Sequence, residues 1–526
     1  HKYMYQNKMS DPRYPIGVQN FEEIRKGGYV YVDKTGFIYE LIRRTKYYFL
    51  GRPRRFGKSL LLSTIKAFFQ GKRDLFEGLD ISTYHDLDWD SYPVIHLDLN
   101  AESYIDSSSL DARIDLLLKE YEKQYNVVET ASTLAGRFYT LIKSAHKFTG
   151  KQVVVLIDEY DKPILDTIHD DSISGLHRDK LRGFYSVLKS TDEHLKFCLL
   201  TGVTKFAHLN IFSGLNNLLD ISLDDRYASI CGITEKELAE NFKVSIGQLA
   251  QVKGITCKET FQILKENYDG YRFSENCADI YNPHSILCCF DKKKIEPFWF
   301  HTGTPTFLIN LMQNRRYELS KVDGTECEGS RMYGVDAAAN DPIPVLYQSG
   351  YLSIKGYDPE YNIYTLGYPN REVKDGFISS LVPHYTGLDK DSTQFSIRHF
   401  IKEIKSGNAE AFMIRIQTLF AAIPYEMQME KEINFQNTLY LLFTLIGLHV
   451  NVEYHTSKGR IDVLIKTNSF IYIIEIKVNS NPDIAIAQIK DIQYSMPFSI
   501  DKREIIKIGA NFSTESRTLE NWKVCR

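Results

Sequence analysis

The stretch that most constrains the fold is a short basic loop that joins an apolar run to a helical run. The residues YYFL at 47–50 have the length and composition of a buried strand, and SLLLSTIKAFF at 59–69 has those of a helix. Between them, GRPRRFGKS at 51–59 ends in glycine, lysine and serine. Because free amides at a helix start and the helix dipole both favour phosphate oxygens, this order predicts a phosphate-binding loop of the Walker A type.

The last three residues of this loop are the predicted ligands of ATP and Mg²⁺. We expect Gly57 to belong to the phosphate-binding turn, the Lys58 ammonium to reach the terminal phosphates and the Ser59 hydroxyl to ligate magnesium. A basic surface loop that merely contains this triplet is the alternative interpretation.

The first half of the loop departs from the usual motif. Arg52 stands where the motif has its first glycine, and Gly51 comes one residue early. Pro53 stiffens the loop, and Arg54 and Arg55 place two cations where a phosphate chain would lie. We therefore expect phosphate binding to rely on side-chain charge more than on a glycine cradle.

A second apolar run ends directly in two acids. In KQVVVLIDEYDKP at 151–163, the residues VVVLI precede Asp158 and Glu159, which predicts a central parallel strand with both acids at its carboxyl end. Ligands of open α/β sheets bind at that edge. We expect Asp158 to hold the magnesium shell and Glu159 to polarise the attacking water, although acids also begin many loops that have no such role.

Two further apolar runs extend the predicted sheet. HLKFCLLTGVTKF at 194–206 predicts a strand that ends at Thr201, and VIHLDLN at 94–100 predicts another. Thr201 would sense the terminal phosphate, or it is a threonine whose hydroxyl is simply satisfied at a strand end. The front of the chain is therefore expected to be an α/β domain with a parallel sheet flanked by helices.

Composition bounds the remaining possibilities. The 526 residues are too many for one ordinary core, and 64 basic against 67 acidic residues give a net charge of -3, so any nucleic-acid footprint must be local. Eight cysteines without paired spacing predict a reduced, cytoplasmic protein. We find no apolar stretch suited to a membrane span or a signal peptide, so no membrane partner is expected.

The middle of the chain is informative about structure but poor in chemistry. ITEKELAENFKV and KETFQILKENYDGYRF predict helices, consistent with a helical lid or a winged-helix-like region. The segments at 344–358 and 361–373 alternate apolar and polar residues, which predicts a hairpin or small sheet. The many tyrosines of this region could stack on bases, but core packing is the favoured interpretation.

The last quarter holds a second set of chemically active residues. Alternating patterns at 450–456, 459–467 and 470–478 predict three strands after a group of helices. Residues two apart share a face, so Glu475 and Lys477 point the same way, and Asp462 can face Glu475 across the hairpin. Two carboxylates and an ammonium around one point suit a magnesium-dependent phosphodiesterase.

The alternative for these three residues is a surface salt-bridge ladder. Against it, Glu475 lies in the otherwise apolar strand IYIIEIK, where an unpaired carboxylate needs a metal or a cation nearby. The helix that follows carries Gln488 and Lys490, which could reach the same site.

The front half of the chain resembles a known family. YPIGVQNFEEIRKGGYVYVDKT, RPRRFGKS, LIDEYDKP and LTGVTKFAHLNIFSGLNNLLDIS, with YDGYRFS and YNPHSIL downstream, resemble the predicted ATPases of the AAA-like superfamily. The resemblance implies ATP binding, and the displaced first glycine is usual in that group. It also implies that Asp33 and Lys34 lie near the nucleotide.

The last part of the chain resembles the nuclease domain of the PD-(D/E)XK superfamily through GRIDVLI, IYIIEIK, AIAQIK and IIKIGANF. The resemblance implies that Asp462, Glu475 and Lys477 are catalytic, that Gln488 is an accessory residue and that Glu432 is an additional metal ligand. The proline that names the superfamily is replaced by Ile461.

These observations predict three domains and one coupled function. We expect a P-loop AAA-like ATPase domain at 1–225, a helical or winged-helix-like region at 226–390 and a restriction-endonuclease-like α/β domain at 391–526. The predicted function is an ATPase that controls a magnesium-dependent nuclease acting on DNA or RNA. The resemblance also raises assembly into homo-oligomers, since AAA-type sites often borrow an arginine from a neighbouring copy.

Two alternative functions remain. In one, an ATP-dependent molecular switch carries a nuclease-like module that binds nucleic acid or a partner without efficient cleavage. In the other, a transport or signalling ATPase uses its C-terminal part as a scaffold.

Overall fold

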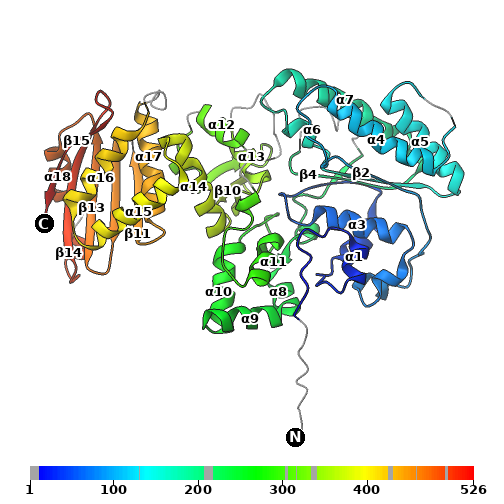
Figure 1. The fold of residues 1–526 in the computed structure, drawn as a ribbon, viewed down its shortest axis with the longest axis horizontal. Coiled ribbons are helices and arrows are strands. Elements are labelled where there is room, and N and C mark those ends of the chain that lie inside the picture. The colour runs from blue at the N-terminus through cyan, green and yellow to red at the C-terminus, as the bar shows by residue number, and fades with distance from the viewer. Residues whose placement is uncertain are drawn as a thin grey trace, which may run out of the picture. The chain divides into compact units, whose positions relative to one another are not determined.

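The computed structural model describes residues 11–128, 131–205, 217–302, 306–314, 317–332, 341–424, 431–457, 459–491 and 496–526. The chain forms two compact units (Figure 1). The first contains His1–Thr302 and Gly324–Glu372, and the second contains Gly303–Asp323 and Val373–Arg526. The chain therefore passes between the units at three places, and the domain boundaries expected from the sequence remain predictions.

A parallel sheet forms the centre of the first unit, as the sequence predicts. Its strands are continuous apolar runs because helices cover both faces, and the central strand β3 is buried along its whole length. The sheet has the order β2-β3-β4-β1-β5, with every neighbouring pair parallel. The strands are β1 (Tyr47–Gly51), β2 (Val94–Asp98), β3 (Val153–Asp158), β4 (Leu195–Gly202) and β5 (Leu219–Asp220).

Helices lie on both sides of this sheet. Because its strands are parallel, their carboxyl ends lie together at one edge. In Figure 1, α4, α5 and α7 lie on one side and α1 and α3 on the other. Leu50 of β1 pairs with Thr201 of β4, and Ile157 of β3 pairs with Leu200, so the predicted site residues meet at this edge. The helices are α1 (Phe21–Lys26), α2 (Thr35–Arg44), α3 (Lys58–Phe69), α4 (Ser109–Gln124), α5 (Leu134–Thr149), α6 (Lys162–Leu165) and α7 (Asp171–Ser190).

The rest of the first unit is a helical region, as predicted, with small sheets beside it. A core of buried apolar residues joins its helices, and Tyr268, Tyr271, Tyr281 and Tyr351 are among its fully buried side chains, which supports packing over base stacking. The elements are α8 (Glu235–Asn241), α9 (Lys243–Lys253), α10 (Cys257–Tyr268), α11 (Pro283–Lys292), β6 (Ile233–Thr234), β7 (Ile280–Tyr281), β8 (Thr325–Glu328), β9 (Ser353–Asp358) and β10 (Ile363–Gly367).

One expectation for this region is wrong in part. The strands β9 and β10 pair antiparallel as predicted, but the segment before β9 is the short helix α13 (Ile343–Gln348) and not a strand. Every residue of α13 is buried, so its sequence carries no periodic contrast between an inner and an outer face. Prolines at its start also favour a helix beginning there.

The second unit is a mixed five-stranded sheet with helices, which confirms the predicted α/β class. The order is β11-β12-β13-β14-β15, with β13 and β14 parallel and the other pairs antiparallel. The strands are β11 (Asn451–Ser457), β12 (Arg460–Lys466), β13 (Phe470–Val478), β14 (Glu504–Ser513) and β15 (Thr518–Cys525), and the helices are α12 (Thr306–Asn314), α14 (Arg371–Thr386, which begins in the first unit), α15 (Lys390–Lys405), α16 (Ala409–Ala422), α17 (Lys431–Ile446) and α18 (Pro482–Asp491).

The helix α18 packs closely on one face of β13 and β14. Ile489 of α18 packs with Ile471 and Ile473 of β13. On β14, Gly509 allows the backbones to approach, because a Cβ there would lie 2.7 Å from Pro482 O and 2.9 Å from Ile486 N. This packing fixes α18 over the half of the sheet that carries Glu475 and Lys477, since Gly509 pairs with Glu475.

We expect Gly509→Ala to destabilise the second unit by about 1–3 kcal/mol, because the methyl group would press on backbone atoms that have little room to move. Thermal unfolding measures this loss. Gly356→Ala is the control, since its Cβ would make an ordinary 3.7 Å contact with Thr365. Equal melting temperatures for both variants and the wild type would contradict the close approach of α18.

Candidate nucleotide and nuclease sites

The loop between β1 and α3 begins a helix whose first turn is open to an anion. Gly57 is the N-cap residue of α3 and has φ 97°, a conformation that favours glycine. Because Gly57 has no side chain to cap the helix, the first amides of α3 are left to other acceptors. Arg55 has φ 64°, so this six-residue loop turns sharply twice. Such a helix start suits a phosphate group.

Three predicted site residues meet at the open edge of the parallel sheet. Ser59 Oγ donates to Asp158 Oδ2 at 2.5 Å, and Thr201 Oγ1 donates to Asp158 Oδ1 at 2.8 Å. Asp158 is only 3% exposed, so the two hydroxyls satisfy a carboxylate that would be costly to bury alone. A hydroxyl and a carboxylate side by side are ligands that Mg²⁺ accepts, so these residues fit the expected ion.

Lys58 is held inside its own loop. Its ammonium donates to the carbonyl oxygens of Arg52 and Pro53, each at 3.1 Å, and lies 3.4 Å from Glu159 Oε1. Glu159 has φ 54°, an uncommon conformation for a residue with a side chain, and one that recurs at functional sites. The structure therefore brings Lys58 and Glu159 together, next in sequence to Ser59 and Asp158.

The three loop arginines have different surroundings. Arg52 is 1% exposed and donates to Ser222 O at 2.8 Å and Tyr227 O at 3.1 Å, so it anchors the loop. Arg54 is partly buried, and its guanidinium lies 5.0 Å from the Trp299 ring centroid. Arg55 is exposed. Of the two predicted phosphate-binding arginines, Arg55 faces solvent and Arg54 packs on an aromatic ring.

An apolar cavity of about 90 Å³ lies next to Gly57. Lys34 lines it, and its ammonium also pairs with Glu237 at 2.7 Å. Asp33 instead accepts hydrogen bonds from Thr35 and from the backbone of Asp80, so it caps α2. Mostly apolar walls beside the start of α3 suit a nucleobase; among the residues that form them are Val30, Tyr31, Leu60, Ile233, Phe242 and Leu287.

The C-terminal acids face one another as the sequence predicts. Asp462 of β12 pairs with Glu475 of β13 in the antiparallel register, so both side chains lie on one face. Lys477 Nζ lies 3.4 Å from Glu475 Oε1 and donates to Gln488 Oε1 of α18 at 2.8 Å. Four of the five predicted C-terminal site residues therefore lie together.

Each carboxylate of this group lies beside a basic side chain, Glu475 beside Lys477 and Asp462 beside Arg460. Glu475 is 1% exposed, and neither of its carboxylate oxygens accepts a hydrogen bond from the described part of the chain. Burial and then the Asp462 carboxylate raise the pKa of Glu475, and burial also raises the pKa of Asp462 against the opposing Arg460. A divalent cation would relieve both effects.

Glu432 is exposed at the start of α17. Among the described residues, no three or more His, Cys, Asp or Glu side chains gather as a metal site, so Glu432 is not brought into one with Asp462 and Glu475. Two carboxylates are nevertheless a common protein ligand set for Mg²⁺, which keeps several waters. Asp462 and Glu475 thus fit that ion by themselves.

Two residues beside the sites were not singled out in the sequence. Arg460 pairs with Asp462 at 3.0 Å. Its position two residues before Asp462 on the same strand indicates that both side chains lie on one face. Asp161 is fully buried and accepts hydrogen bonds from the amides of Val203 and Thr204. No local pattern predicts that Asp161 connects the loop after β3 to the loop after β4.

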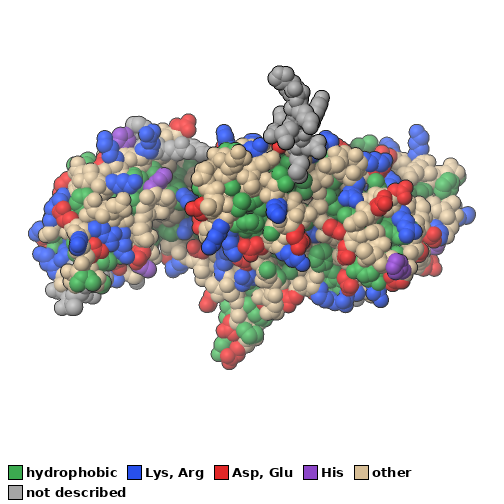
Figure 2. Space-filling model, turned by 90° about the horizontal axis from the view of Figure 1, so that it is seen from below, with side chains coloured by type: hydrophobic (Ala, Val, Ile, Leu, Met, Phe, Trp, Pro, Cys, Tyr) green, Lys and Arg blue, Asp and Glu red, His purple; other side chains and the backbone are tan. Residues whose placement is uncertain are grey.

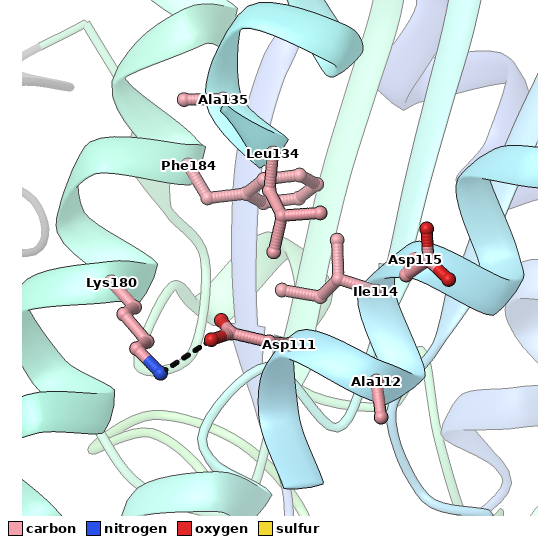
Figure 3. Close-up of a pocket in the computed structure, with 8 residues that line it drawn as sticks. All are labelled: Asp111, Ala112, Ile114, Asp115, Leu134, Ala135, Lys180 and Phe184. Carbon is pink, nitrogen blue, oxygen red and sulfur yellow. Dashed lines mark hydrogen bonds and ion pairs between the residues drawn. The ribbon is translucent and has the colours of Figure 1, made fainter. Parts of the chain in front are cut away.

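A cavity of about 560 Å³ lies between α4, α5 and α7 (Figure 3). Ile114, Leu134 and Phe184 converge on it, and the Lys180 ammonium pairs with Asp111 at its rim. Because its charged lining residues are already paired with one another or with neighbours, this cavity offers no catalytic group.

The charge of the surface is mixed. Figure 2 shows Lys and Arg side chains interspersed with Asp and Glu over the face in view, in keeping with the net charge of -3. Within the described residues, no helix combines the length and the apolar character needed to cross a bilayer.

Comparison with known proteins agrees with both family resemblances. Residues 15–212 match the predicted AAA-ATPase family, and residues 430–522 match the PD-(D/E)XK nuclease superfamily. A protein of Azotobacter chroococcum mcd 1, described as an uncharacterized protein in the vnfD 5′ region, is 35% identical over 531 residues. The match covers 98% of this chain and 99% of that protein. No solved structure matches the chain.

The chain therefore belongs to the predicted AAA-ATPase family and carries a C-terminal domain of the PD-(D/E)XK nuclease superfamily.

We expect Glu475→Gln to raise the free energy of unfolding by on the order of 1 kcal/mol at neutral pH without metal, because the variant no longer buries a charge. Since the folded state raises the pKa of Glu475, its charge destabilises the fold above the unfolded value of about 4.3, and the gain should vanish at lower pH. Thermal unfolding at several pH values measures both.

Mg²⁺ provides the complementary measurement. Addition of Mg²⁺ should raise the melting temperature of the wild type but not that of Glu475→Gln, because binding to the folded state alone is stabilising. Equal metal responses in both proteins would argue against an ion at Glu475.

Proposed function

We propose that this protein binds and hydrolyses ATP and couples it to metal-dependent cleavage of phosphodiester bonds in DNA or RNA. The observation that carries the proposal is Glu475, a buried carboxylate without a hydrogen bond from the described residues, set opposite Asp462 and beside Lys477. Because Glu475 is 1% exposed, its pair with Lys477 lies below the surface, and the arrangement is therefore unlike a surface salt-bridge ladder.

The ATP site would use residues that are already assembled. The amides at the start of α3 and the Lys58 ammonium would bind the phosphates, and the apolar cavity lined by Lys34 would take the base. Ser59 and Asp158 would hold Mg²⁺, which neutralises charge on the phosphates. Glu159, once Lys58 turns to the phosphates, is free to accept a proton from water. Thr201 holds Asp158 in place.

The nuclease site would divide the work between three side chains. Asp462 and Glu475 would hold Mg²⁺, which stabilises negative charge on the phosphate and lowers the pKa of bound water. Lys477 would orient the attacking water or stabilise the charge that develops on the phosphate oxygens. Gln488 fixes the Lys477 ammonium by accepting its hydrogen bond, so α18 serves as a support for the site.

One observation favours the alternative, a switch whose nuclease-like module binds nucleic acid without efficient cleavage. The Arg460 guanidinium pairs with Asp462 at 3.0 Å and so competes with a metal ion for that carboxylate. If Arg460→Ala gains cleavage that the wild type lacks, the wild-type protein acts as the switch.

Substitutions in the ATP site should separate binding from hydrolysis. Lys58→Ala should lose nucleotide binding, because charge-assisted hydrogen bonds to the phosphates are removed. Glu159→Gln should bind ATP but hydrolyse it about 10²-fold or more slowly. Equilibrium titration with a fluorescent ATP analogue and a phosphate-release assay measure the two steps. Lys72→Ala, an exposed lysine just beyond α3, is the control. Wild-type affinity in Lys58→Ala would refute this site.

Cleavage of single- and double-stranded DNA and RNA, with Mg²⁺ or Mn²⁺ and with or without ATP, tests the second site. Glu475→Ala and Lys477→Ala should each lose activity by about 10² or more, since each removes a group that acts on the developing charge. Glu453→Gln on the neighbouring strand β11 is the control, because Glu453 is exposed and pairs with Lys466. Activity that survives both substitutions would place the chemistry elsewhere.

A further inference from the structure

The ATP-binding loop is gripped by residues that lie far from it in the sequence. Trp299 is fully buried, and its indole Nε1 donates to the carbonyl oxygen of Arg54 at 3.1 Å. The Arg54 guanidinium lies over the same ring, 5.0 Å from its centroid, and donates to Thr302 O at 3.3 Å. One residue of the loop is therefore held through its backbone and its side chain at once.

Trp299 is in turn fixed by a buried carboxyl group. Glu372 is 4% exposed, and its Oε1 accepts from the backbone amide of Trp299 at 2.7 Å. The Ser285 hydroxyl lies 2.9 Å from both oxygens of Glu372. Hydrogen bonds to a buried acceptor of this kind hold the partner backbone in one position.

The other wall of the grip is made by a glycine. Gly350 has φ 89°, and a Cβ at this position would lie 2.8 Å from Pro53 Cβ and 3.4 Å from the Trp299 ring. Gly350 thus lies against both Pro53 and Trp299. These contacts are made to the first half of the loop, in which Arg52 replaces the glycine of the usual motif. Residues outside the loop therefore fix the conformation of this half.

The residues that hold the loop also lie where the chain leaves the first unit. Thr302 and Glu372 are the last residues of the first unit before the two places where the chain enters the second unit. Arg54 contacts Thr302 directly and reaches Glu372 through Trp299. Both connecting segments therefore begin at contacts of the ATP-binding loop.

We propose that Trp299 and Glu372 are positioning residues for the ATP-binding loop. We also propose that Arg54 changes position when nucleotide binds, and that its contacts with Trp299 and Thr302 transmit this change to the two segments that enter the nuclease-like unit. The inference deepens the ATP site and coupling proposed above and rests on them. Trp299 and Glu372 form its fixed part, and the Arg54 guanidinium forms its moving part.

Arg54 has a physical reason to move. Its guanidinium lies over a ring face and donates to the neutral carbonyl oxygen of Thr302, and a triphosphate offers charged acceptors that form stronger hydrogen bonds than such a carbonyl. Turning toward the phosphates would release Thr302 O while the Arg54 backbone stays bonded to Trp299. A nucleotide can shift the conformation of the connection because the two Arg54 arrangements differ in their interactions with it.

The first experiment uses Trp299 as its own reporter. The chain has three tryptophans, so the variant W89F/W522F retains Trp299 alone. A slowly hydrolysed ATP analogue with Mg²⁺ should change the intensity or wavelength of Trp299 emission, and the change should disappear with Arg54→Gln. Unchanged emission at nucleotide saturation, established separately by equilibrium dialysis, would overturn the moving part of the proposal.

The second experiment tests the positioning role with a matched pair. Glu372→Ala should weaken nucleotide binding about five- to tenfold, as expected for loss of a buried hydrogen bond, and should remove the effect of ATP on cleavage while metal-dependent cleavage persists. Burial raises the pKa of Glu372 to about 8, so its carboxyl is largely protonated at neutral pH and Glu372→Gln should restore both properties.

Trp299→Phe keeps a ring but removes the N–H donor, and it serves as the second variant if Glu372→Ala does not fold. It should show the same fivefold or greater loss of affinity and the same loss of coupling. Wild-type affinity and coupling in Trp299→Phe would overturn the inference. Wild-type affinity in Lys58→Ala would instead refute the ATP site itself, so the two failures can be distinguished.

Discussion

Both sites depend on the same constraint, which is that a carboxylate buried on an apolar strand must be compensated. In the first unit, Asp158 ends a fully buried strand and receives hydrogen bonds from Ser59 and Thr201. In the second unit, Glu475 lies within a comparable strand, Phe470–Val478, and receives none from the described residues. The difference separates a carboxylate that is satisfied by two hydroxyl groups from one that lies beside a second carboxylate and an ammonium group. Each arrangement is compatible with a divalent cation, but for a different electrostatic reason.

The loop between β1 and α3 is anchored by a residue that departs from the Walker A motif. Arg52 replaces the expected glycine and turns inward, where its guanidinium bonds to the carbonyl oxygens of Ser222 and Tyr227 and lies over the Phe273 ring. A buried arginine is tolerated when its donors are paired, so the loop is anchored from beneath. Its two positive φ angles, at Arg55 and Gly57, then form the turn that leads into α3. Positive charge on this loop is therefore partly structural.

The sequence predicted the parts of this structure that local pattern determines. Apolar runs identified four strands of the parallel sheet, alternating patterns identified β11, β12 and β13, and period-two spacing correctly placed Asp462 opposite Glu475. Local pattern failed at α13, which is buried on every side, and at β15, an edge strand in which Leu519 alone is buried. It could not reveal the anchors of Arg52, whose partners lie 170 and 175 residues away, or the ion pair that Lys58 forms with Glu159, because neither follows from spacing along one strand.

The passage of the chain back and forth between its units has a consequence for how such a protein can be built. Asn437 of α17 is 2% exposed, and its side-chain amide bonds to the backbone of Tyr317 and Leu319. These two residues lie in Gly303–Asp323, the segment of the second unit that interrupts the sequence of the first. A fragment that starts at Val373 would leave this amide without those partners inside the core. The nuclease-like part therefore cannot be moved to another protein as one continuous segment. A fusion that begins at Val373 would lack residues 303–323, some of which pack in the core of this unit.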